Sequence, residues 1–162
     1  MEPDIEVKVG ALIMEPHSGT PIVVLRGVSD ETVIPIWVGT FEANAIALEI
    51  EKTVPQRPMT HDLLRNIITQ FGAVVERVII TELRSDTFFA LIEMRQADGQ
   101  LIVIDARPSD AIALALRFSC GIWVKPDVVR LAGTNINSAA DNEDPIEEES
   151  LTEDWPDVIG ES

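Results

Sequence analysis

The chain has 162 residues, of which 46% are hydrophobic, and its formal net charge at pH 7 is -16. This length and composition are sufficient for one sizeable core, so we expect a single domain. No apolar stretch approaches the roughly 18 residues of a membrane span, no secretory leader is recognisable, and the single cysteine excludes an internal disulfide framework, so we expect a cytoplasmic protein without a membrane partner.

The first third of the chain predicts a meander of three strands followed by a helix. Alternating apolar residues and turn residues place these strands over residues 5 to 14, 21 to 26 and 32 to 38. Pro35 favours an edge position for the third strand, because proline cannot donate to a neighbouring strand. Gly39 and Thr40 then mark the start of a helix expected over residues 41 to 52, with Thr40 as its N-cap.

The middle of the chain predicts a second helix, a second meander and a third helix. From Thr60 to Phe71, apolar residues recur at amphipathic spacing. Strands are expected over residues 73 to 83, 87 to 96 and 100 to 104, with a short last strand over residues 122 to 124. Pro108 suits the first turn of a helix over residues 109 to 119, whose apolar circumference predicts burial in the domain or in a subunit interface.

These elements predict an α+β fold: a single domain over residues 1–131, with two antiparallel meanders in a mixed sheet and about three helices. Residues 132–162 are expected to form an acidic tail. Ten acidic and no basic side chains fall within residues 131 to 162, which leaves only -6 of the net charge on the domain. Low hydrophobicity from Gly133 to Ser150 predicts disorder there.

The common catalytic motifs are absent from the sequence. There is no glycine-rich phosphate loop, no paired CxxC, no HExxH and no GxSxG. Two histidines do not suffice for a multi-histidine zinc site, which leaves carboxylate sites for a hard metal as the metal chemistry to consider.

The densest polar cluster runs from Asp105 to Asp110, where a strand ends and the third helix begins. Asp105 and Asp110 could hold Mg2+ or Mn2+, and Arg107 could clamp a phosphate with paired donors. An ordinary structural explanation also fits: Asp110 or Ser109 caps the helix, Asp105 accepts backbone donors, and Arg107 pairs with one of the acids.

A second cluster, from Arg57 to Asp62, lies at the start of the second helix. His61 could act as general acid or base, because its ordinary pKa of about 6.5 is close to working pH, and Asp62 is its neighbour. The simpler alternative is an exposed histidine beside a carboxylate that complements the helix dipole.

The third cluster spans Gly39 to Glu42, at the start of the first helix. Glu42 could be a third metal-binding or water-orienting carboxylate, although the helix dipole alone would explain it. All three clusters lie at helix N-termini, whose free backbone N–H groups can accept anions. Sequence alone leaves open whether they meet in space.

Taken together, these motifs resemble the bifunctional nuclease family, over roughly residues 5 to 131. The matching segments are Pro35 to Gly39 with Glu42–Ala43, Arg57 to Leu63, and Asp105 to Leu114. The resemblance implies a compact α+β fold, homo-oligomers and nuclease activity on DNA and RNA. It brings no established catalytic residues, so the candidates are those of suitable chemistry in the matching motifs: His61, Asp62 and Arg107 for catalysis, and Glu42, Asp105 and Asp110 for metal.

Three functions are compatible with these observations. The first is Mg2+- or Mn2+-dependent hydrolysis of phosphodiester bonds in DNA and RNA, with Arg57, Arg65 and Arg107 offsetting the negative charge of the domain. The second is a non-catalytic oligomeric regulatory or binding module, whose alanine-rich helices form the subunit interface and whose polar clusters recognise an anion or a protein partner. The third is an enzyme acting on a small phosphorylated or anionic metabolite.

Overall fold

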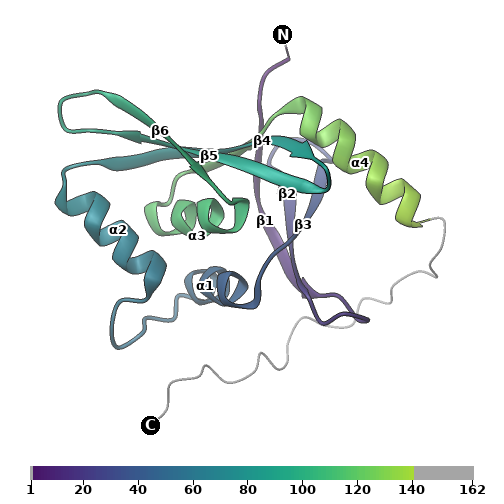
Figure 1. The fold of residues 1–162 in the computed structure, drawn as a ribbon, viewed down its shortest axis with the longest axis horizontal. Helices are drawn as coiled ribbons and strands as arrows, with labels where there is room; N and C mark the ends of the chain where they lie inside the picture. The colour runs from purple at the N-terminus through teal and green to yellow at the C-terminus, as the bar shows by residue number, and fades with distance from the viewer. Residues whose placement is uncertain (1, 141–162) are drawn as a thin grey trace.

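The computed structural model describes residues 2–140, and side chains up to residue 133 (Figure 1). Within this part, one seven-stranded sheet has the strand order β3-β2-β1-β7-β4-β5-β6. Four helices accompany the sheet, so the predicted α+β class and mixed sheet are confirmed. The strands are β1 (Ile5–Met14), β2 (Pro21–Gly27), β3 (Val33–Trp37), β4 (Val74–Arg84), β5 (Thr87–Arg95), β6 (Leu101–Ala106) and β7 (Gly121–Val124).

The sheet consists of the two predicted meanders joined by the short strand β7. Strands β1 to β3 pair antiparallel in one half, and β4 to β6 pair antiparallel in the other. Strand β7 is antiparallel to β1 and parallel to β4, so it makes a single sheet of the two halves. Strand β3 lies at one edge, as Pro35 predicts.

Helices α1 (Thr40–Ile50), α2 (Thr60–Gln70) and α3 (Pro108–Phe118) lie together on one side of the second meander (Figure 1). Each begins within a residue or so of its predicted start. Helices α1 and α3 contact each other, and Ala43, Ala111 and Ala113 between them are fully buried. The alanine-rich helices therefore belong to the core of one chain, so of the two predicted alternatives, burial in the domain and burial in a subunit interface, the structure has the first.

The fourth helix, α4 (Pro126–Ala140), is not predicted by the sequence analysis. Its buried residues Val128 and Ala132 are four positions apart, and α4 contacts β3 and β4. The predicted domain end at residue 131 falls inside this helix, and residues 141 to 162 of the expected tail lie outside the described residues. No helix in the described part of the chain is long and apolar enough to cross a membrane.

Candidate functional site

The N-termini of α1, α2 and α3 meet, and each brings a carboxylate in the third helical position. These residues are Glu42, Asp62 and Asp110, and each lies in the first turn of its helix. A carboxylate at this position is favoured by the positive end of the helix dipole. Three separate sequence motifs thus contribute one equivalent acidic residue each to the same region.

Arg107 joins the first and third helices. Its Nη2 lies 2.8 Å from Glu42 Oε1, and its Nε donates to Asp110 Oδ2 over 2.9 Å. The Glu42 hydrogen bond, followed by that to Asp110, raises the pKa of Arg107, which keeps the guanidinium charged. The Arg107 side chain is nevertheless 66% exposed, so it can exchange its partners for an incoming anion.

Asp110 also binds His61 and thereby joins α3 to α2. Its Oδ1 lies 2.8 Å from His61 Nε2, while Oδ2 is held by Arg107. The His61 side chain is only 9% exposed, so packing fixes the position of the ring. A continuous chain of polar contacts therefore runs from Glu42 through Arg107 and Asp110 to His61.

Gly39, the N-cap of α1, makes room for the Glu42 carboxylate. A Cβ atom built on Gly39 would lie 2.2 Å from Glu42 Oε2, far closer than two atoms can approach. A side chain at this position would require the end of the Glu42 side chain to shift. The glycine of the first motif is therefore explained by the placement of Glu42.

Asp62, the third carboxylate, takes part in a separate buried network. Its Oδ1 accepts from Arg117 Nε over 2.8 Å, and its Oδ2 accepts from the Met59 amide over 3.0 Å. Arg117 also donates to the carbonyls of Ala45 and Ala113, so this one side chain ties α1, α2 and α3 together. Burial alone would raise the pKa of Asp62, but the hydrogen bonds from Arg117 and Met59 outweigh it and hold the pKa below its ordinary value.

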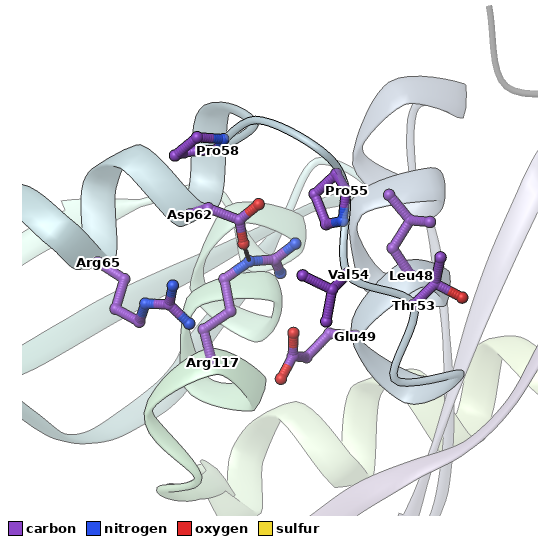
Figure 2. Close-up of a pocket in the computed structure, with 9 residues that line it drawn as sticks. All are labelled: Leu48, Glu49, Thr53, Val54, Pro55, Pro58, Asp62, Arg65 and Arg117. Atoms are coloured by element: carbon purple, nitrogen blue, oxygen red, sulfur yellow. Dashed lines mark hydrogen bonds and ion pairs between the residues drawn. The ribbon is translucent and has the colours of Figure 1, made fainter. Parts of the chain in front are cut away.

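A hollow of about 180 Å3 lies beside this buried pair (Figure 2). Asp62 and Arg117 form part of its wall, together with Glu49 and Arg65. Two carboxylates and two guanidinium groups balance each other there, so the hollow itself carries no marked charge. Its volume is below the roughly 300–1,000 Å3 of typical small-molecule sites, so this hollow by itself does not have the size of such a site.

The structure thus brings together four of the six predicted site residues: Glu42, His61, Arg107 and Asp110. Asp105 lies on strand β6 opposite Leu91 and is exposed, and its side chain makes no hydrogen bond or ion pair in the described part of the chain. Within residues 2–133, no three His, Cys, Asp or Glu side chains form a group that could hold a metal ion. A metal site made of all three predicted carboxylates therefore finds no support in this arrangement.

Comparison with known sequences agrees with the arrangement of the motifs. A model of the bifunctional nuclease domain matches residues 23–137. The chain therefore belongs to the bifunctional nuclease domain family. It is 40% identical over 139 residues to two Mycobacterium tuberculosis proteins, "Uncharacterized protein Rv1829" (strain ATCC 25618 / H37Rv) and "Uncharacterized protein MT1877" (strain CDC 1551 / Oshkosh), with 85% of this chain and 82% of each relative covered.

Proposed function

We propose that the protein is a metal-dependent nuclease that hydrolyses phosphodiester bonds in DNA and RNA. The observation that carries this proposal is the chain of contacts from Glu42 through Arg107 and Asp110 to His61, which three family motifs build from three helices. Membership of the bifunctional nuclease domain family supports the same reaction class. A cytoplasmic location belongs to the proposal and rests on the sequence argument alone.

The charges of this site favour a divalent cation. Two carboxylates and one guanidinium leave the group at -1 when His61 is neutral, which would repel a phosphodiester. Glu42 Oε1 and Asp110 Oδ2 lie 2.8 and 2.9 Å from the same Arg107 nitrogen, so both can face one cation. Two carboxylates suffice for Mg2+ or Mn2+, because such ions keep water and substrate oxygens as their other ligands.

Each residue has a definite role in this proposal. A bound metal ion would supply Lewis-acid polarisation of the phosphoryl oxygen. Arg107, mostly exposed, binds a non-bridging phosphate oxygen with its paired donors. A neutral His61 that donates from Nε2 to Asp110 keeps its lone pair on Nδ1, which can accept a proton from water.

Metal dependence is the first test. We expect the purified protein to cleave labelled DNA and RNA with Mg2+ or Mn2+ and to lose cleavage in EDTA. We also expect calorimetry to show Mn2+ binding that weakens about tenfold or more in Glu42→Gln, because one ligand loses its charge. Glu51→Gln, at the other end of the same helix, is the matched control and should bind as the parent does.

Absence of both Mn2+ binding and metal-dependent cleavage in the parent protein would contradict the proposal. The alternative, a non-catalytic binding module, would then be preferred, since it needs only the exposed Arg107 and the helix N-termini to recognise an anion. Contaminating nuclease is excluded by purifying the parent and Glu42→Gln proteins side by side, because a contaminant would follow both preparations.

We further propose a homo-oligomer formed through the edge strand β6. Leu101, Val103 and Ile104 of this strand are 43 to 50% exposed, and β6 pairs only with β5 in the described part of the chain. An exposed apolar edge strand is a ready partner for a second copy of itself. The opposite edge, β3, is contacted by α4 and offers less room.

A lysine on the exposed face of β6 tests this assembly. We expect Val103→Lys to reduce the molar mass in solution to that of one chain, because the charge would be buried between two edge strands. Val33→Lys, on the edge strand β3 and 39% exposed, should keep the mass of the parent. Light scattering coupled to size exclusion measures both, and a parent protein of one chain at high concentration would contradict the assembly.

A further inference from the structure

Two exposed aromatic side chains flank the first helix N-terminus of the site. Phe41 takes the second position of α1 and is 82% exposed, whereas His61 and Ser109, in the same position of α2 and α3, are 7 and 6% exposed. Trp37, at the end of β3, is 53% exposed. This segment, residues 37 to 41, therefore presents two large rings to solvent, and at the second helical position it exposes a ring where α2 and α3 bury their side chains.

The two rings lie in the segment that leads directly into Glu42, a residue of the site. Phe41 directly precedes Glu42, whose carboxylate binds the exposed guanidinium of Arg107. The chain has only eight Phe and Trp residues and no Tyr, so two exposed rings within five residues are a concentration of aromatic surface. Single exposed apolar residues are ordinary on protein surfaces, but two rings in the segment that leads into Glu42, the partner of an exposed guanidinium, match what unpaired nucleotides require.

We propose that Trp37 and Phe41 form a stacking platform for unpaired bases, so that the substrate is single-stranded nucleic acid. This inference rests on the proposed function. Bases in a duplex are already stacked and paired, and their faces are not available to a protein side chain. In a single strand, a base can stack on an exposed ring while the adjacent phosphate reaches Arg107, and this contact is tolerant of base identity and of the sugar.

The test compares two phenylalanines that are similarly exposed but lie in different parts of the fold. Phe41 is 82% exposed beside the site, and Phe71 is 85% exposed immediately after the end of α2. Binding of fluorescent oligo-dT, oligo-rU and a DNA hairpin duplex is measured by anisotropy in Ca2+. We expect Phe41→Ala to weaken binding of both single strands about tenfold or more, Phe41→Trp to retain it, and Phe71→Ala to bind as the parent does.

The outcomes separate this inference from the nuclease proposal. Unchanged single-strand binding in Phe41→Ala, or an equal loss for single strands and duplex, would overturn the stacking platform even if the parent cleaves DNA and RNA. Single-strand binding that depends on Phe41 without any cleavage by the parent would support the platform and refute the nuclease. Because Phe41 is so exposed, thermal unfolding of Phe41→Ala should match that of the parent.

Discussion

The Asp110→Asn variant is expected to lose cleavage of DNA and RNA by at least about 100-fold in kcat while remaining folded. Asp110 binds both Arg107 and His61, and its two carboxylate oxygens are divided between them. An amide keeps the shape but removes the charge and one acceptor. The substitution should therefore disturb metal binding, phosphate binding and proton transfer together, and single-turnover cleavage measures the combined loss.

Asp105→Asn is the matched control for this variant. It is the same chemical change five residues earlier, at an exposed position of β6 whose side chain makes no hydrogen bond or ion pair in the described residues. We expect its kcat to stay within about threefold of the parent, because Asp105 takes no part in the contacts that run from Glu42 through Arg107 and Asp110 to His61. A loss in Asp105→Asn equal to that in Asp110→Asn would restore the original three-carboxylate prediction and require the site to rearrange on metal binding.

Asp105 is close in sequence to Arg107 and Asp110 but does not join their site. Asp105, Arg107 and Asp110 form one motif, and the sequence analysis assigns all three to one site. Asp105 lies opposite Leu91 on the edge strand β6 and is exposed, while Arg107 is the N-cap of α3 and Asp110 lies in the first turn of that helix. At a connection from a strand to a helix, residues of one sequence motif can therefore belong to different parts of the surface.

The convergence of the three helix starts was not derivable from the sequence, although each start was predicted. In each motif, a glycine or proline near polar residues indicates the start of a helix, and this signal is local in the sequence. Their meeting depends on the packing of α1 against α3 and of α2 against α3, which are contacts distant in the chain. A signal for Arg117 was present: it is the single cation of α3 and follows an apolar run from Ala111 to Leu116, and a buried cation needs a partner.

In the fold as well, the local elements were predicted and the pairings between distant segments were not. Turn residues and alternation located both meanders, because hairpin pairing is local. The place of β7 between them could not be foreseen, since its partners β1 and β4 are far away in sequence. Helix α4 was missed because glycine and asparagine in its second half lower its helical propensity, and up to residue 133 its buried residues are Val128 and Ala132 alone.

The Arg117→Met variant is expected to be the most destabilised of the substitutions considered, with a loss of about 3–5 kcal/mol in the free energy of unfolding. Arg117 is 2% exposed at its side chain, and methionine would fill much of the space without replacing its donors. Asp62 would then be a nearly buried carboxylate without its cation, and two helix carbonyls would lose a donor. Thermal unfolding should show a Tm lower by roughly 10 °C.

Arg95→Met provides the control, because Arg95 also pairs with a carboxylate, Glu76, but on the exposed surface. Its Tm should stay within about 3 °C of the parent, as exposed ion pairs contribute little.

Unfolding at several pH values then separates the contribution of the Arg117 charge to stability from the contribution of its packing. Since the folded pKa of Asp62 lies below its ordinary value of 3.8, the pair stabilises the parent above that pH and loses its effect as the pH falls through the folded pKa. The difference in Tm between parent and Arg117→Met should therefore narrow below about pH 4, and a difference that stays constant in acid would mean that Arg117 acts through its packing rather than through its charge.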